Sequence, residues 1–82
     1  MKLRPLYENE YRRIQEIEPF SNYSHATITV SQGQEMLTDE WKPTEITWPG
    51  CGAHNAQGTL EFADALKFAV DLAQTWDAER VK

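Results

Sequence analysis

The hydrophobic and polar positions of the chain change their spacing from one segment to the next. From Pro5 to Glu18, the apolar side chains fall on one helical stripe formed by Leu6, Tyr7, Ile14 and Ile17. A proline suits the first turn of a helix, and Pro19 would end it because the residue before a proline avoids the α region. The pattern therefore predicts an N-terminal helix over residues 5–18.

The middle of the chain alternates between apolar and polar positions, which is typical of strands with one buried face. Residues 25–31 and 44–48 both show this alternation, and Pro49 ends the second segment. The predicted inward side chains are Ala26, Ile28 and Val30 in the first strand and Ile46 and Trp48 in the second. A turn is expected at residues 32–34, and residues 35–41 fit either a short strand around Met36 and Leu37 or a loop.

The longest apolar pattern predicts a helix over residues 59–79, with Thr59 as its N-cap. Its apolar side chains cover about half of the helical circumference, well beyond the stripe of about 100° that an ordinary surface helix needs. They are Phe62, Ala65, Leu66, Ala69, Val70, Leu72, Ala73 and Trp76.

Together these elements predict a single α+β domain over residues 1–82. It is a small two-layer sandwich with an N-terminal helix, a two- to three-stranded antiparallel sheet and a long C-terminal helix. A sheet of that size is barely stable alone and leaves part of the last helix uncovered. We therefore expect a homodimer or another tight complex, with Phe68, Leu72 and Trp76 at the oligomer interface.

The composition is that of a folded protein from a reducing compartment. Hydrophobic residues make up 40% of the 82 positions, which is enough for a packed core. Cys51 is the only cysteine, and no apolar run follows the first residues. We expect a cytoplasmic location and no membrane partner.

The net charge is −5, and the acidic residues concentrate in the middle of the chain. Between residues 14 and 66 there are eight Asp or Glu residues and a single basic one, Lys42. This distribution repels phosphate backbones, so direct binding of nucleic acid is disfavoured. It would attract basic protein surfaces instead, including the nucleic-acid-binding grooves of other proteins.

Acidic residues of the β region, with one tryptophan, form the candidate partner-binding surface. Its members are Glu35, Asp39, Glu40, Trp41 and Glu45. The simpler interpretation is a solvated face that keeps the protein soluble, and the functional one is a negatively charged surface for a basic partner. For Trp41 the alternatives are an interface anchor and a side chain folded back over the sheet edge.

Residues 50–58 form a glycine-rich loop and are the second candidate site. Gly50, Cys51, Gly52 and His54 would let backbone N–H groups hold an anion or nucleotide, although such glycines also serve simply to turn a chain. Cys51 and His54 would also suit a thiolate nucleophile with an imidazole base, but no third orienting group is identified. The shortage of Cys and His residues predicts no metal, and no cofactor is expected.

The small size, acidic charge and aromatic-rich core are similar to those of accessory proteins of phages and mobile elements. That similarity, which involves no sequence motif, implies an inhibitor of host nucleic-acid-binding proteins. The leading hypothesis is a non-enzymatic protein-binding module or small inhibitor. The alternatives are an oligomeric small-ligand binder that uses residues 50–58 and an enzyme that uses Cys51 and His54.

Overall fold

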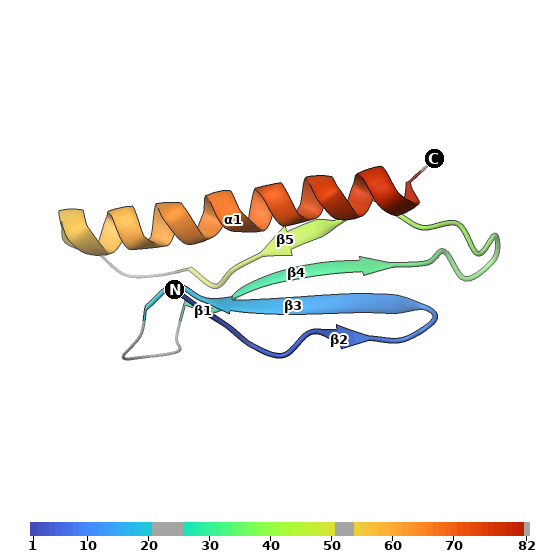
Figure 1. The fold of residues 1–82 in the computed structure, drawn as a ribbon, viewed down its shortest axis with the longest axis horizontal. Helices are drawn as coiled ribbons and strands as arrows, with labels where there is room; N and C mark the ends of the chain where they lie inside the picture. The colour runs from blue at the N-terminus through green and yellow to red at the C-terminus, as the bar shows by residue number, and fades with distance from the viewer. Residues whose placement is uncertain (21–25, 51–53, 82) are drawn as a thin grey trace.

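An antiparallel sheet with one long helix along one of its faces makes up the described part of the chain (Figure 1). The computed structural model describes residues 1–20, 26–50 and 54–81. The strands are β1 (Lys2–Leu3), β2 (Tyr7–Glu8), β3 (Arg12–Glu18), β4 (Ile28–Gly33) and β5 (Glu45–Thr47), and the helix is α1 (Ala56–Arg80).

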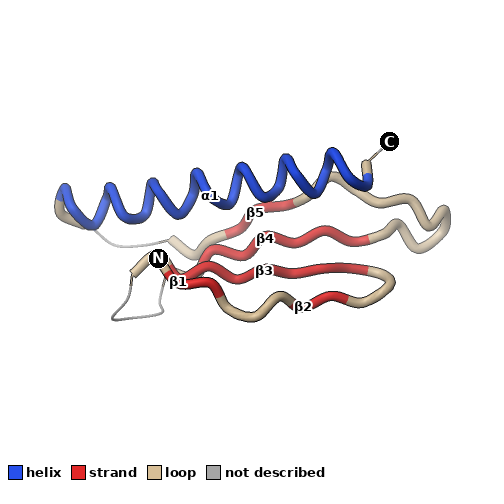
Figure 2. The backbone as a smooth tube through the Cα atoms, in the orientation of Figure 1, coloured by secondary structure: helices blue, strands red, loops and turns tan. Residues whose placement is uncertain are grey.

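β3 and β4 form the centre of the sheet. β1 and β2 pair with opposite ends of β3 along the same edge, and β5 pairs with the outer edge of β4 (Figure 2). Ile17 of β3 lies opposite Ile28 of β4, and Val30 of β4 lies opposite Ile46 of β5. This register places the apolar side chains of three strands on the same face, and α1 packs against that face.

The predicted N-terminal helix is not present in the described residues, because the chain reverses direction at Asn9. The Asn9 side-chain oxygen accepts hydrogen bonds from the backbone N–H groups of Tyr11 (2.8 Å) and Arg12 (2.9 Å). An asparagine that bonds its own backbone in this way stabilises a turn rather than a helix. Residues 5–18 therefore contribute β2, this turn and β3.

Polar side chains on the buried face of β3 explain why its alternation is hard to detect in the sequence. Arg13, Gln15 and Ile17 are buried, whereas Ile14 lies on the opposite face and is only partly buried. Glu18 is buried as well, so three of the four buried positions of β3 are polar, and no clean alternation of hydrophobic residues results. The predicted α+β fold with an N-terminal helix and two or three strands is wrong. The described residues form a five-stranded sheet and one helix.

The core lies between the central strands and the middle of α1. Ala26, Ile28 and Val30 are buried, as their alternation predicted. On the helix, the buried positions are Ala65, Ala69, Ala73 and Trp76. Three of these four side chains are a single methyl group, so the helix backbone can approach the sheet closely.

The edge strand β5 departs from its prediction at one position. Ile46 is partly buried and packs against the core, as expected. Trp48 was predicted to point inward, but it is 50% exposed. β5 ends at Thr47 and lies at the sheet edge, so the strand no longer directs the next side chain toward α1.

The helix begins three residues earlier than its sequence pattern indicated, at Ala56. Its N-cap is Asn55 rather than Thr59, since the Asn55 side chain accepts a hydrogen bond of 2.8 Å from the Gly58 backbone N–H. The Thr59 hydroxyl instead donates to the Asn55 carbonyl (2.9 Å) within the first turn. Gly58 is a poor helix former, and this makes the true start difficult to identify from sequence.

Asn55→Ala is expected to lower the free energy of unfolding by about 1 kcal/mol, because it removes the acceptor for an otherwise unpaired N–H group. Asn55→Asp keeps that acceptor and is expected to stay within about 0.5 kcal/mol of the wild type. Urea unfolding followed by circular dichroism measures both variants. Equal stability of Asn55→Ala and the wild type would show that the cap contributes nothing.

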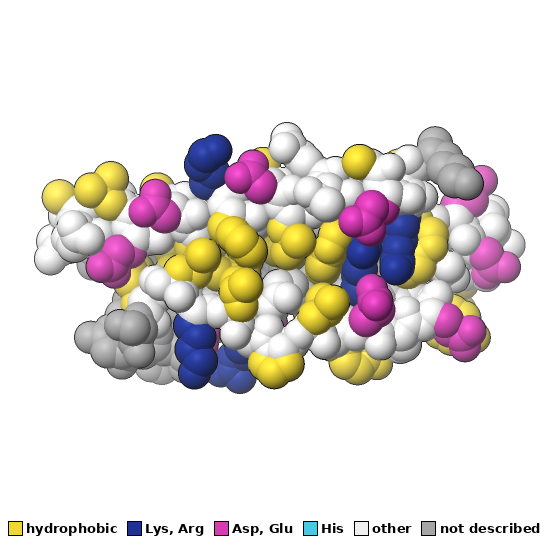
Figure 3. All heavy atoms as spheres, in the orientation of Figure 1, with side chains coloured by type: hydrophobic (Ala, Val, Ile, Leu, Met, Phe, Trp, Pro, Cys, Tyr) yellow, Lys and Arg dark blue, Asp and Glu magenta, His cyan; other side chains and the backbone are white. Residues whose placement is uncertain are grey.

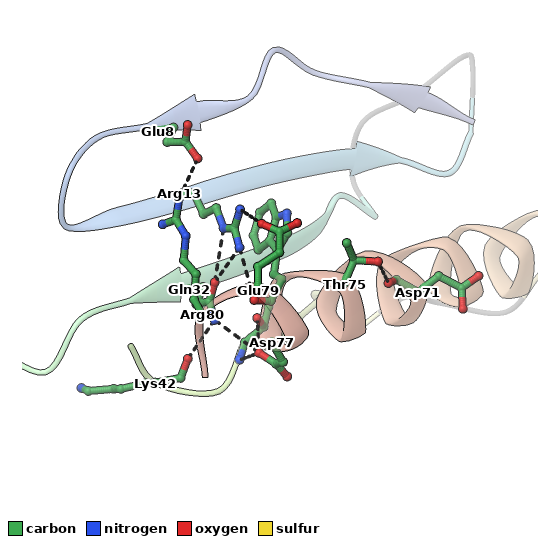
Figure 4. A network of polar contacts seen from close by, with 11 residues as sticks. Glu8, Arg13, Gln32, Lys42, Asp71, Thr75, Asp77, Glu79 and Arg80 are labelled. Carbon is green, nitrogen blue, oxygen red and sulfur yellow. Dashed lines mark hydrogen bonds and ion pairs between the residues drawn. The ribbon is translucent and has the colours of Figure 1, made fainter. Parts of the chain in front are cut away.

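A polar network fixes the C-terminal part of α1 to the sheet (Figure 4). Arg13 of β3 is only 5% exposed, and its guanidinium lies 4.4 Å from the centroid of the Trp76 ring. Its Nε and Nη2 atoms donate to Gln32 Oε1 (3.2 and 3.1 Å), and Nη1 donates to Glu79 Oε2 (3.1 Å). A buried charge is costly unless it is paired and hydrogen-bonded, and here every guanidinium nitrogen has a partner.

The network continues from Gln32 toward β5. Gln32 is 2% exposed, and its side-chain amide donates to the Lys42 carbonyl (3.1 Å). Asp77 of α1 accepts hydrogen bonds from the backbone N–H (2.8 Å) and the hydroxyl (2.6 Å) of Thr44. The last turns of the helix therefore hold the segment that leads into β5.

The sheet face away from α1 is mainly polar. Thr29 and Ser31 alternate with the buried residues of β4, and Glu45 of β5 lies opposite Ser31.

Near β1, Arg4 donates a hydrogen bond to Glu18 (2.8 Å), and this hydrogen bond raises the pKa of the Arg4 guanidinium.

Candidate partner-binding surface

Three chain segments meet at one end of the molecule: the β2–β3 turn, the β4–β5 loop and the C-terminal end of α1 (Figure 1). The molecule is elongated, since its radius of gyration is 13.9 Å, compared with about 12 Å for a compact chain of this length. The Gln34 backbone N–H donates to the Tyr11 carbonyl (3.0 Å), and Arg80 Nη2 lies 3.4 Å from Glu8 Oε2. These contacts hold the three segments together.

Residues 35–40, which we call the hairpin tip, close the β4–β5 loop. Gln34 and Trp41 form a β-bridge below the tip. Inside the tip, the Glu35 N–H donates to the Glu40 carbonyl (2.7 Å), and the Asp39 N–H donates to the Glu35 carbonyl (2.9 Å). Asp39 has a φ of 58°, in the left-handed region that aspartate tolerates better than most residues. The tip is thus a loop held by its own backbone hydrogen bonds.

Two neighbouring apolar side chains project from the tip into solvent. Met36 and Leu37 are each 92% exposed, and Tyr11 of the adjacent turn is 61% exposed. Tyr11 and Met36 also line one pocket of about 330 Å³, which we call the apolar pocket, together with Gln34, Glu35 and Asp39. Single exposed hydrophobic residues are ordinary, but adjacent ones beside a pocket are typical of interaction surfaces.

Acidic side chains border these apolar groups, and Figure 3 shows acidic side chains gathered at this end of the molecule. Glu35 forms an ion pair with Lys42 (3.5 Å). Within the described ranges, Asp39 and Glu40 have no basic group at ion-pair distance. Asp39 and Glu40 line a second pocket of about 290 Å³, the polar pocket, together with Trp41 and Arg80.

Trp41 combines features of the two alternatives raised by the sequence. It is partly buried, and the Arg80 guanidinium lies 4.1 Å from the centroid of its ring. Arg80 thus fixes the indole against the end of α1, while the ring still lines the polar pocket. A cation over a tryptophan face is a favourable contact of about 0.5–2 kcal/mol.

The structure brings together four of the five predicted surface residues. Asp39, Glu40 and Trp41 share the polar pocket, and Glu35 lies at the base of the same tip. Glu45 is separate, since it lies in β5 opposite Ser31 on the polar face of the sheet.

Sequence reasoning missed Met36, Leu37, Tyr11 and Arg80. Large apolar residues inside a segment rich in turn-forming and acidic residues are the signal that could have identified the first two. Tyr11 and Arg80 are distant in sequence from the tip, so only the fold reveals them.

The glycine-rich loop falls partly outside the described residues. Cys51 and Gly52 lie outside the described residues, so the anion-binding loop and the Cys51–His54 pairing stay predictions. Gly50 is exposed, and nothing lies within 4 Å of where its Cβ would be. The His54 ring lies 5.1 Å from the Phe20 ring, and its buried Nε2 has no hydrogen-bond partner among the described residues. His54 is thus packed against an apolar neighbour.

The predicted oligomer interface is mostly part of the protein's own core. Trp76 is 5% exposed within one chain, and Phe68 and Leu72 are partly buried against the core. α1 packs against β3, β4 and β5, so the two added strands, β1 and β2, do not cover it. Oligomeric state stays a prediction.

No family model, curated protein or solved structure matches this chain. Within residues 1–20, 26–50 and 54–81, no cluster of three or more His, Cys, Asp or Glu side chains could hold a metal ion. Over the same ranges, no helical segment combines the length and apolar character that a bilayer span requires.

Proposed function

We propose that this chain is a protein-binding module that docks through its hairpin tip onto a basic partner protein. The observation that carries the proposal is the exposure of Met36 and Leu37 beside two carboxylates that have no basic partner among the described residues. A partner would present an apolar pocket bordered by lysine or arginine side chains.

The energetics of the tip support this proposal. Full burial of one Met or Leu side chain contributes about 1.5–3 kcal/mol, so Met36 and Leu37 could together supply much of a micromolar affinity. Backbone hydrogen bonds already order the tip, so docking would cost less conformational entropy than docking of a flexible loop. The Asp39 and Glu40 carboxylates would add specificity and accelerate association with a positively charged surface.

The charge of the whole chain favours a basic protein over a nucleic acid. A net charge of −5 opposes contact with phosphate groups and favours contact with a cationic surface. If that surface is the nucleic-acid-binding groove of the partner, docking would exclude the nucleic acid and the protein would act as an inhibitor.

Met36→Ser/Leu37→Ser is expected to reduce partner capture at least tenfold, because two anchoring side chains are lost. The measurement is quantitative affinity capture from lysate, with every bait at equal concentration. The matched control is Leu60→Ser/Val70→Ser, which removes two exposed apolar side chains from α1 and should leave capture unchanged. Circular dichroism verifies that each bait is folded.

Charge reversal tests the basic character of the partner. Asp39→Lys/Glu40→Lys is expected to weaken capture and to flatten its dependence on salt concentration. A captured protein that binds this variant and the wild type equally at every salt concentration would contradict a basic partner.

The proposal as a whole depends on the apolar side chains of the tip. Equal capture by the wild type and by Met36→Ser/Leu37→Ser would overturn it.

A further inference from the structure

Two pockets lie on either side of Asp39 at the hairpin tip. Asp39 lines both the polar pocket, of about 290 Å³, and the apolar pocket, of about 330 Å³. Pockets for cofactors and drug-sized ligands occupy about 300–1,000 Å³, so each of these lies at the lower end of that range. Their size suits single side chains of a partner, and a shared wall requires those side chains to be neighbours.

The polar pocket has the charge to accept a cation. Asp39 and Glu40 supply two carboxylates, and Trp41, whose ring already contacts the Arg80 guanidinium, supplies an aromatic wall. Arg80 lines the same pocket, but its positive charge is offset by Glu8, whose carboxylate lies 3.4 Å away. The remaining charge of the pocket is therefore negative.

The apolar pocket has the opposite character. Tyr11 and Met36 are its apolar lining residues, and both side chains are largely exposed in the free protein. Glu35, its acidic neighbour, is already paired with Lys42 at 3.5 Å. An apolar side chain seated here would shield Tyr11 and Met36 from water without displacing an ion pair.

We propose that the hairpin tip recognises a basic and an apolar side chain presented together by an extended segment of its partner. The basic side chain occupies the polar pocket and the apolar side chain occupies the apolar pocket. In an extended segment, residues i and i+2 point to the same side, so this spacing suits two adjacent pockets. This inference rests on the proposed function and specifies the chemistry that the same surface would recognise.

The test is an NMR titration of the full ¹⁵N-labelled chain with acetylated, amidated tripeptides. The probe has leucine first and arginine third, and the two control probes replace arginine by glutamate or leucine by glycine. The leucine–arginine probe is expected to shift the amide signals of Met36, Asp39 and Glu40 and the indole N–H signal of Trp41. Both control probes are expected to bind more weakly.

A pair of charge-neutralising variants assigns the basic side chain to its pocket. Asp39→Asn/Glu40→Gln keeps the shape of the pocket, and asparagine tolerates the positive φ at position 39. Binding of the leucine–arginine probe is expected to fall by about 2- to 30-fold. Glu45→Gln/Glu61→Gln removes the same formal charge away from the tip and should leave binding unchanged.

Three outcomes would overturn the inference: no signal shifts at the solubility limit of the probe, equal binding of all three tripeptides, or shifts confined to residues outside the tip. These outcomes leave the proposed function standing if the Met36/Leu37 variant still loses partner capture. Unchanged capture by that variant would instead remove the proposed function itself.

Discussion

Trp76→Ala is expected to lower the free energy of unfolding by about 3–5 kcal/mol, the largest effect of any single substitution considered for this protein. Trp76 is 5% exposed in the core, and its ring lies against the buried Arg13 guanidinium. A domain of 82 residues has a total stability of about 4–12 kcal/mol, so this variant would lose a quarter or more of that stability and would be partly unfolded if the total lies at the low end.

Urea unfolding followed by circular dichroism measures this loss, with Trp48→Ala as the matched control. Trp48 is 50% exposed, so its truncation should cost less than about 1 kcal/mol. If Trp76 lay at an interface between two chains instead, Trp76→Ala would change how the solution mass depends on protein concentration. The free energy of unfolding of a single chain would then stay close to that of the wild type. A stability loss below about 1 kcal/mol in Trp76→Ala would show that the tryptophan is not part of the core.

Arg13→Ala is expected to cost about 2–4 kcal/mol in the free energy of unfolding. The substitution leaves the buried Gln32 Oε1 atom without a donor, which alone costs about 1–3 kcal/mol. It also removes the packing of the arginine stem against its neighbours. Arg12→Ala, at the next position but with an exposed side chain, is expected to cost less than about 1 kcal/mol.

A double variant measures the energetic coupling between Arg13 and Gln32. Arg13→Met/Gln32→Leu replaces both members of the pair by apolar side chains and leaves no orphaned acceptor at Gln32. The double variant is therefore expected to lose less free energy of unfolding than Arg13→Met and Gln32→Leu lose in total as single variants. Exact additivity would indicate that the hydrogen bonds between Arg13 and Gln32 have no energetic role.

The same two residues show why part of the fold could not be predicted. β4 alternates cleanly because Ile28 and Val30 face α1, and its buried face was correctly identified. In β3 the buried positions include Arg13 and Gln15, and the hydrogen-bond partners of Arg13 are distant in sequence. Arg13 bonds Gln32 and Glu79, so its burial could not be inferred from the segment around it.

The long helix was predictable for a complementary reason. Its core-facing positions repeat from Phe62 to Trp76, and a pattern of that length survives errors at its ends. The start was misplaced because Asn55 caps the helix ahead of Gly58, a residue that usually argues against helix. The hydrogen bonds of the cap therefore set where α1 begins, whereas the repeat of apolar positions identifies the segment as a helix.

The acidic part of the candidate surface was predicted from the sequence, whereas its exposed apolar side chains were not. Asp39, Glu40 and Trp41 were grouped because they are close in sequence, and they do line one pocket. The sequence around Met36 and Leu37 fitted either a short strand or a loop. Their exposure follows from the closure of residues 35–40 by the tip's own hydrogen bonds, which local composition did not reveal.

The order of the elements along the chain has a consequence for synthesis. All five strands precede α1, the helix that covers their apolar face. At about 5–20 residues per second, the ribosome needs about 1–5 s to add the 25 residues of α1. During that interval the emerging sheet lacks its cover, and Arg13 lacks Trp76 and Glu79. The sheet is therefore exposed to proteases and to aggregation until α1 has been synthesised.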